Sequence, residues 1–212
     1  MDQAELLGMF LNNSQIPQFQ RKSMAEGLPD YLRHCAKSST LDSDHLYLEL
    51  GVFTGCTFSV IRNCVPQHIT MYGFDTFEGL PEDWMIDDTN ILYAKGRFQV
   101  EHIPNDTPNS KFIKGRIEDT LDDFLKEQDK KVGFVHLDMD LYSGTYYALN
   151  KLRPYLVPGT VLAFDDFYDL PGWQNHSFKA LLDFANETNT GFEPLCAVGM
   201  KTGWASAAIK IV

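Results

Sequence analysis

The sequence is short of basic residues, because 18 Lys and Arg stand against 29 Asp and Glu, a formal net charge of −11. This charge argues against broad binding of nucleic acids or anionic membranes, which attract clustered lysine and arginine. The 4 cysteines form no CxxC pair, so we expect no disulfide framework or zinc site and a reducing, cytoplasmic location. No apolar run approaches the roughly 20 residues of a membrane span, and no signal peptide is expected.

The composition is that of a globular protein, with 44% hydrophobic and 22% charged residues and no internal repeat. A length of 212 residues suits a single domain over residues 1–212 that buries a sizeable core. Residues 1–44 are polar, with helical patterning interrupted at Pro17, Gly27 and Pro29. We expect these residues to form a helical N-terminal segment.

From residue 45 onward, short apolar runs alternate with stretches of helical period. This alternation, with continuous apolar strands, is typical of a parallel sheet covered on both faces. The predicted strands are residues 45–50, 70–74, 111–114, 133–137, 160–164, 192–198 and 205–212. The predicted helices are residues 57–64, 117–127, 145–156 and 176–188.

Two segments depart from this alternation. Residues 76–110 form an insertion rich in Pro, Asp, Asn and aromatic residues, and a loop of that length is usually functional, so we expect a lid. Only residues 199–204 separate the last two strands, which is too short for a crossover and requires an antiparallel pair. The predicted fold is α/β, a Rossmann-like, doubly wound, mostly parallel seven-stranded sheet with an antiparallel C-terminal hairpin.

A glycine-containing turn follows the first predicted strand, in LYLELGVFTGCTFS at residues 46–59. Gly51 and Gly55 let the backbone pass close to a ligand, and a helix opening at Thr57 offers unpaired N–H groups. The pattern is G-x-x-x-G rather than the dinucleotide fingerprint G-x-G-x-x-G. A ligand site and a plain strand-to-helix turn therefore both remain open.

Asp75 lies just past the second predicted strand, in GFDTFEGLP. It lies near the roughly 20-residue offset from the glycine turn at which a carboxylate accepts hydrogen bonds from a ribose diol. The alternative is a turn cap. After the third strand, Ile117 and Glu118 supply an apolar and a hydrogen-bonding residue suited to flank an adenine, although Asp119 fits a simple helix cap.

Four carboxylates follow the fourth and fifth predicted strands, Asp138 and Asp140 in HLDMDLYSGT and Asp165 and Asp166 in VLAFDDF. The carboxyl ends of parallel strands meet at one crevice, so we expect these acids to share a site. Like charges in one site repel unless a cation or a proton neutralises them, and carboxylate oxygens suit Mg²⁺. The alternative is a mixture of solvated acids and helix caps.

Together these stretches resemble a class I S-adenosylmethionine-dependent methyltransferase, and most closely the macrocin/mycinamicin O-methyltransferase group. Thr76 stands where the group has serine, and Phe167 where tyrosine is commoner. Six stretches over about residues 46–184 carry the resemblance: LELGVFTG, GFDTFEGLPEDW, YAKGRF, HLDMDLYSGT, PGTVLAFDDF and PGWQNHSFKA.

The resemblance implies a donor site, a cation site and a base. S-adenosylmethionine would be bound by Glu49, Gly51, Val52, Phe53, Thr54, Gly55, Asp75, Thr76, Ile117, Glu118 and Asp138. A divalent cation such as Mg²⁺ would be held by Asp138, Asp165 and Asp166. The candidate catalytic residues are Asp138, Asp140 and His176, of which the histidine fits a helix cap and a substrate contact equally well.

The predicted function is methyl transfer from S-adenosylmethionine to a hydroxyl of a small molecule, a sugar or another natural product. A bound cation lowers the pKa of such a hydroxyl, and a carboxylate takes its proton. One alternative is an inactive SAM-, nucleotide- or metal-binding module in an assembly, which has no need of four acids. Another, a nicotinamide oxidoreductase, lacks its fingerprint. The expected partner is the small acceptor, and association into a homo-oligomer is left open.

Overall fold

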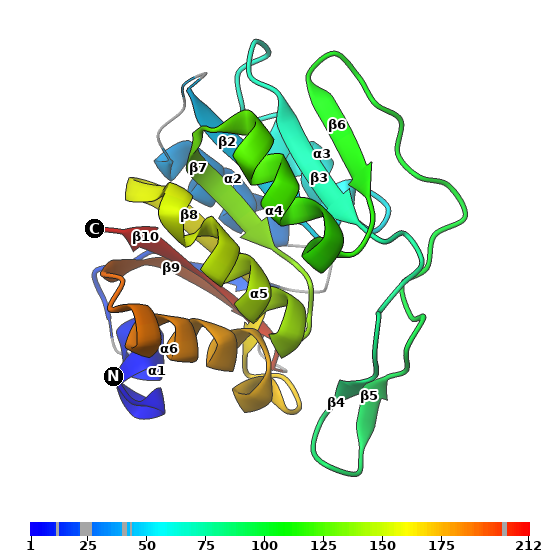
Figure 1. Ribbon diagram of the computed structural model, residues 1–212. Helices are drawn as coiled ribbons and strands as arrows, with labels where there is room; N and C mark the ends of the chain where they lie inside the picture. Colours follow the sequence, from blue (N-terminus) through cyan, green and yellow to red (C-terminus); the bar gives the residue numbers. More distant parts are fainter. Residues whose placement is uncertain (12, 22–26, 40–41, 43, 201–202) are drawn as a thin grey trace.

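The computed structural model describes residues 1–11, 13–21, 27–39, 42, 44–200 and 203–212 (Figure 1). They build an 8-stranded sheet in the order β1-β9-β10-β8-β7-β2-β3-β6. The sheet strands are β1 (Gln18–Arg21), β2 (His45–Leu50), β3 (Met71–Asp75), β6 (Ser110–Lys114), β7 (Lys131–Leu137), β8 (Leu156–Tyr168), β9 (Phe192–Met200) and β10 (Ala205–Ile211). Two short strands, β4 (Trp84–Met85) and β5 (Ile91–Tyr93), pair separately as a hairpin.

Helices cover both faces of the sheet (Figure 1). One face carries α1 (Gln3–Leu11), α4 (Ile117–Gln128), α5 (Tyr142–Leu152) and α6 (Ser177–Thr188), and the other carries α2 (Leu28–Ser38) and α3 (Cys56–Arg62). Two 3₁₀ turns, η1 (Arg153–Tyr155) and η2 (Trp173–Asn175), lie in the connections. None of the helices in the described part of the chain is long and apolar enough to cross a bilayer.

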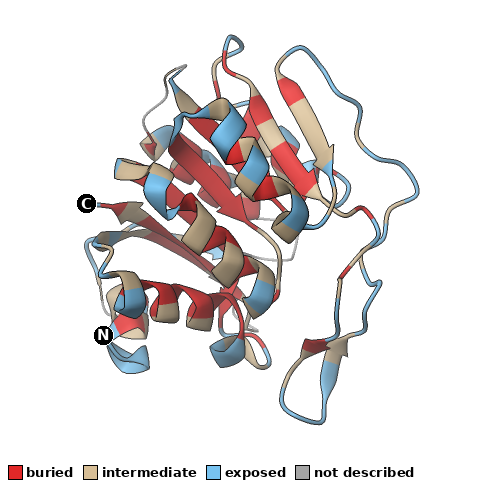
Figure 2. Cartoon of the chain, in the orientation of Figure 1, coloured by how far each residue is buried: buried red, intermediate tan, exposed pale blue. Residues whose placement is uncertain are grey.

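The packing explains why these segments take these structures. In α4, Leu121 and Leu125 are buried one turn apart, which is the spacing of a helix with one apolar face. The sheet strands in the middle of the molecule are buried while the helices keep an exposed outer stripe (Figure 2). This pattern confirms the predicted α/β sheet with helices on both faces.

The chain reverses its direction of winding between β2 and β7. β3 and β6 lie on one side of β2, and β7 and β8 lie on the other, all paired in parallel. Such a switch point leaves a crevice at the carboxyl ends of the strands, where open α/β sheets bind ligands. The antiparallel β9–β10 pair confirms the predicted C-terminal hairpin.

The predicted seven strands were one too few, because β1 pairs in parallel with the outer edge of β9. The sequence of β1, QFQR, has one apolar residue and no strand-like run, so residues 1–44 were predicted as helical. The strand forms because the edge of β9 offers unpaired backbone groups. This tertiary pairing overrides the weak local preference of the segment.

β8 also runs beyond its predicted end at residue 164. Its partner β10 continues the ladder as far as the pairing of Ala205 with Tyr168. Asp165 and Asp166 therefore lie inside a strand rather than in the loop after it. The register of the β8–β10 pairing shifts opposite these two residues, between Ala205 and Ala207 of β10, and both carboxylates line the same cavity.

Candidate active site

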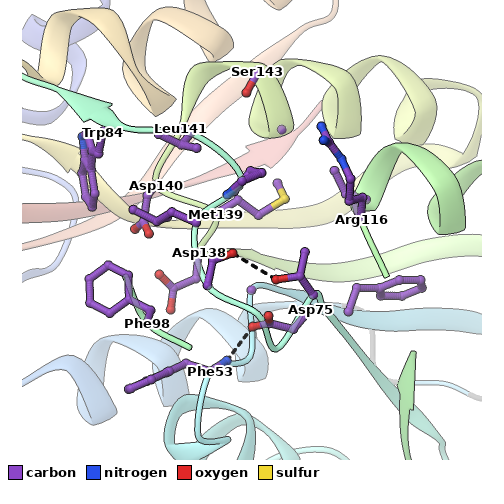
Figure 3. Close-up of a pocket in the computed structure, with 18 of the residues that line it drawn as sticks. Phe53, Asp75, Trp84, Phe98, Arg116, Asp138, Met139, Asp140, Leu141 and Ser143 are labelled. Carbon is purple, nitrogen blue, oxygen red and sulfur yellow. Dashed lines mark hydrogen bonds between the residues drawn. The ribbon is translucent and has the colours of Figure 1, made fainter. Parts of the chain in front are cut away.

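The crevice at the switch point is a cavity of about 280 Å³ at the carboxyl ends of the central strands (Figure 3). It is closed on one side by the insertion between β3 and β6. The residues that line it are Gly51, Phe53, Phe74, Asp75, Thr76, Gly79, Leu80, Pro81, Trp84, Tyr93, Phe98, Gly115, Arg116, Ile117, Glu118, Asp138, Met139, Asp140, Leu141, Ser143, Gly144, Asp165, Asp166 and Trp204.

The glycine turn after β2 is fastened to the neighbouring strand ends. Gly51 has φ +89°, and a Cβ built there would lie 1.8 Å from the backbone oxygen of Asp138. Only glycine fits a position with this backbone conformation and this approach. The turn is therefore held directly against the chain that carries the acidic residues.

Asp75 organises this turn through its carboxylate (Figure 3). One oxygen accepts hydrogen bonds from the backbone N–H groups of Val52 at 2.8 Å and Phe53 at 2.7 Å. The other accepts from the N–H of Phe77 at 2.6 Å. Asp75 thus lines the cavity and also holds the backbone on both sides of it.

The residues predicted to bind S-adenosylmethionine, the methyl donor, divide into two groups. Seven line the cavity: Gly51, Phe53, Asp75, Thr76, Ile117, Glu118 and Asp138. The others, Glu49, Val52, Thr54 and Gly55, are not among its lining residues. Gly55, at φ +81°, precedes the first residue of α3. This second group therefore belongs to the end of β2 and to the turn between β2 and α3.

Glu49 lies beneath the cavity in a buried pair with His136. Both side chains are fully buried, and a ring nitrogen of His136 lies 2.8 Å from a carboxylate oxygen of Glu49. Burial raises the pKa of Glu49, although the hydrogen bond from His136 opposes the shift. This pair joins β2 to β7 below the floor of the site.

Three carboxylates meet at the far end of the cavity. One oxygen from each of Asp138, Asp140 and Asp166 lies within 4.8 Å of the others. The cation ligands predicted from the sequence are Asp138, Asp165 and Asp166. In the structure, Asp140 rather than Asp165 belongs to the group. Asp165 lines the same cavity, and its carboxylate accepts from Ser206 on β10 at 3.4 Å.

Burial and the neighbouring acids raise the pKa values of two members of the cluster, Asp138 and Asp140. Burial, followed by the charges of Asp165, Asp140 and Asp166, raises the pKa of Asp138 well above its ordinary value. Burial and the neighbouring Asp166 likewise raise the pKa of Asp140. Asp140 also has φ +64°, a sparsely populated conformation that is common in functional sites. The cluster is therefore suited to accept a cation or a proton.

The insertion folds over the cavity as a lid, which we define as residues 76–110. Its residue Glu82 accepts a hydrogen bond from Ser143 of α5 at 2.6 Å. Trp84 of β4 is 1% exposed and packs with Leu80, Leu141 and Leu170. These contacts hold the lid against the carboxyl end of the sheet.

His176 fastens the lid and does not line the cavity. Its Nε2 lies 2.6 Å from the backbone oxygen of Met85, so this nitrogen carries the proton and donates. Its ring packs edge-on against Trp84 at 5.8 Å. Nearby, Gly172 has φ +77°, and a Cβ there would lie 2.5 Å from the backbone oxygen of Ile86. Two contacts therefore clamp β4 to the segment before α6.

Replacing His176 with alanine is expected to loosen the lid. The substitution removes one hydrogen bond and one ring contact, which together should raise the KM for the acceptor roughly tenfold. Amide exchange in residues 82–93 should become faster, while the affinity for S-adenosylhomocysteine stays unchanged. His176→Gln, which keeps a donor, should recover part of the loss.

The exposed His68, outside this cavity, provides the control variant His68→Ala. Equal exchange of the lid in wild type and His176→Ala would show that His176 does not hold the lid.

The residues that line the cavity but were not predicted as site residues include the aromatic Tyr93, Phe98 and Trp204, together with Arg116 and Met139. Tyr93 and Phe98 lie in the insertion, whose richness in aromatic residues was the available signal. Trp204 lies between β9 and β10, and no local pattern connects that turn with the crevice.

The fold is an open α/β sheet with a glycine turn, an acid at the end of the next strand and a cavity at the switch point. This combination defines a Rossmann-like enzyme that binds a nucleoside cofactor. A methyltransferase domain family matches residues 48–167, which is more than half of the chain. The chain belongs to this family and is an S-adenosylmethionine-dependent methyltransferase.

Solved structures show the same fold. CalS11, a calicheamicin methyltransferase, aligns with a TM-score of 0.65 and 22% identity over 86% of this chain and 76% of that chain. The O-methyltransferase NovP aligns at 0.58 and 16%, over 86% and 78%. An O-methyltransferase from Bacillus cereus in complex with SAH aligns at 0.57 and 12%, over 100% and 91%. A search of curated protein sequences finds no match.

Proposed function

We propose that this enzyme transfers the methyl group to a hydroxyl of a small molecule with the help of a divalent cation, as in the macrocin/mycinamicin O-methyltransferase group. The observation that carries the proposal is the group of three carboxylates at the end of the cavity, with oxygens within 4.8 Å of one another. CalS11, which shares the fold, is described as a TDP-rhamnose 3'-O-methyltransferase, and NovP as an O-methyltransferase. The fold also occurs in proteins described as rRNA methylases, so the proposal depends on the site.

The acidic cluster fits a hard divalent cation. Carboxylate oxygens are the ligands that Mg²⁺ prefers, and it takes few of them while keeping several waters. Asp138, Asp140 and Asp166 would hold the ion. When bound, such an ion lowers the pKa of a hydroxyl that it coordinates. Its charge would also offset the mutual repulsion that, together with the larger effect of burial, raises the pKa values of Asp138 and Asp140.

The proposed reaction is a single displacement. The acceptor oxygen forms a bond to the methyl carbon as the bond from that carbon to sulfur breaks, and S-adenosylhomocysteine leaves as a neutral thioether. The hydroxyl proton passes to a carboxylate of the cluster and then to solvent. Positioning supplies much of the rate in such a displacement.

The chain's own residues divide the work between two ends of the cavity. Asp75 and the glycine turn hold the donor end, where Thr76, Ile117 and Glu118 lie. Asp138 and Asp140 lie at the acceptor end, where a carboxylate of the cluster accepts the hydroxyl proton. The lid excludes water from the space between them.

A direct assay tests the proposal. The protein is incubated with S-adenosylmethionine, MgCl₂ and a panel of hydroxyl, amine and thiol compounds, and the products are identified by mass spectrometry. We expect S-adenosylhomocysteine to form together with O-methyl products. Transfer only to nitrogen or sulfur would contradict the proposal.

A further inference from the structure

The acceptor end of the cavity has an aromatic wall, which we define as Trp84, Tyr93, Phe98 and Trp204. The ring centroids of Trp84 and Tyr93 are 5.7 Å apart, those of Tyr93 and Phe98 are 5.2 Å apart, and those of Trp84 and Trp204 are 6.2 Å apart. The rings come from β4, β5, the lid after β5 and the β9–β10 turn. Such a set presents ring surface to whatever enters the cavity.

The aromatic wall and the acidic cluster belong to one compartment. The indole N–H of Trp204 donates a hydrogen bond to the carboxylate of Asp166. Trp84 and Phe98 lie on the same side of the cavity as Asp140 (Figure 3). A group that binds between these rings therefore has its edge directed at the carboxylates.

One positively charged side chain packs against the aromatic wall, because the guanidinium carbon of Arg97 lies 5.5 Å from the ring centroid of Tyr93 and 5.2 Å from that of Phe98. Among the described residues that line the cavity, the one lysine or arginine is Arg116, which lies on the opposite side in Figure 3. It is paired with Glu118 at 3.3 Å. Five aspartates line the cavity, and four of them, Asp138, Asp140, Asp165 and Asp166, follow or end the strands at this end. A divalent cation on three of these four would still leave the compartment without net positive charge. An acceptor with a phosphate or carboxylate would meet net repulsion there, because the carboxylates outnumber the positive charges.

The beginning of α5 also borders the cavity, and a side chain of the lid already binds there. Helix N-termini are common sites for phosphate groups. Here Ser143 in the first turn donates to the carboxylate of Glu82 from the lid. A negative side chain of the protein itself therefore occupies this position.

We propose that the acceptor is an uncharged planar aromatic hydroxyl compound, a phenol or a catechol, rather than a nucleotide-linked sugar. This inference rests on the proposed O-methyl transfer and specifies its substrate class. A flat ring gains stacking contacts with the partly exposed rings of Tyr93, Phe98 and Trp204 that a puckered ring makes less well. Its hydroxyl, at the ring edge, reaches the acidic cluster.

Three matched acceptors test the planarity and the charge separately. Catechol and cis-1,2-cyclohexanediol both carry a vicinal diol on a six-membered ring, but only catechol is flat. 3,4-Dihydroxybenzoate adds a carboxylate to the catechol ring. With S-adenosylmethionine and MgCl₂, we expect kcat/KM for catechol to exceed both others by at least about tenfold, the scale of one ring-stacking interaction. Equal values, or a nucleotide-linked sugar as the better acceptor, would overturn the proposal.

Variants of the aromatic wall provide a second measurement. Tyr93→Leu and Phe98→Leu each remove a ring but keep an apolar side chain, and each should lower kcat/KM for catechol roughly tenfold. The affinity for S-adenosylhomocysteine should not change. Phe19→Leu is the control, because Phe19 is also half-buried and aromatic but lies on β1, outside the cavity. Unchanged catalysis in both wall variants would contradict the proposal.

The outcomes separate this inference from the proposed function. Methylation of cyclohexanediol as fast as catechol would support O-transfer and overturn the planar acceptor. Methylation of the nitrogen of o-phenylenediamine, with none of catechol, would contradict O-transfer and support the planar acceptor. If none of these compounds is methylated, calorimetry with S-adenosylhomocysteine and MgCl₂ present decides the matter. Catechol binding then supports the inference, and no binding overturns it.

Discussion

Replacing Asp75 with alanine is expected to weaken the binding of S-adenosylhomocysteine by about 3 kcal/mol or more, a factor of over 100. The carboxylate of Asp75 accepts hydrogen bonds from the backbone N–H groups of Val52, Phe53 and Phe77. Without this carboxylate, three backbone N–H groups lose their hydrogen-bond acceptor, and the turn after β2 loses its conformation. Any contact of Asp75 with the donor's ribose would be lost as well. Titration calorimetry measures the effect directly.

Two further variants make this result specific. Asp75→Asn keeps one acceptor oxygen and should bind with intermediate affinity. Asp106 is a matched control, because it also accepts from a backbone N–H, that of Phe112 at 2.9 Å, but does not line the cavity. Asp106→Ala should bind normally. Wild-type affinity in Asp75→Ala, with the fold intact by circular dichroism, would show that Asp75 does not organise the donor site.

Removing divalent cations with EDTA is expected to lower methyl transfer at least about 100-fold, because an ion that acidifies the acceptor hydroxyl contributes several kcal/mol. Donor affinity should stay largely unchanged, because Asp75 and the glycine turn, which hold the donor end, are not part of the acidic cluster. Asp166→Asn should reproduce much of the loss, while its amide oxygen still accepts from Trp204. Full activity in EDTA would refute the role of the cation and leave Asp138 or Asp140 as a metal-free base.

The control here is Asp165→Asn. The sequence alone ranked Asp165 equal to Asp166 as a cation ligand, whereas the structure places Asp140 in the cluster instead. We therefore expect Asp165→Asn to reduce activity much less than Asp166→Asn. A larger loss in Asp165→Asn would favour the ligand set predicted from the sequence.

The acidic cluster also sets how stability depends on pH when no cation is present. The pKa values of Asp138 and Asp140 are raised above their ordinary value of 3.8 in the folded protein. Between that value and the raised ones, the folded state binds more protons than the unfolded state, so the free energy of unfolding falls as pH rises. MgCl₂ should restore stability, most strongly at the higher pH. Asp138→Asn should flatten the dependence without added cation.

Much of the site was predictable because it depends on short-range patterns. A strand, a turn containing Gly51, a second strand and Asp75 follow one another within one βαβ unit, and the parallel pairing of β2 with β3 brings them together. The terminal hairpin was also predictable, since residues 199–204 cannot span a crossover. These features depend on the length of a connection and on local periodicity, both of which are present in the sequence.

The role of His176 was not predictable in the same way. A histidine that opens a helix near the crevice is suited to contact a substrate, and the sequence offered no sign of its partner. Its bond to the backbone of Met85 joins residues 91 positions apart, through a lid whose path no periodicity describes. The aromatic wall likewise assembles from the lid and from Trp204, near the C-terminal end of the chain.

The sequence by itself determined the α/β class, the order in which the motifs follow the parallel strands, and the presence of several acids at one edge of the sheet. These features depend on the spacing of apolar residues and on the direction of successive strands, which are local properties of the chain. Only the tertiary structure decided which acids meet. Pairing with β10 extends β8 through Asp165 and Asp166, and the register of this pairing shifts beside them, so the place of each carboxylate depends on the partner strand. Asp166 therefore joins Asp138 and Asp140, while Asp165 contacts Ser206.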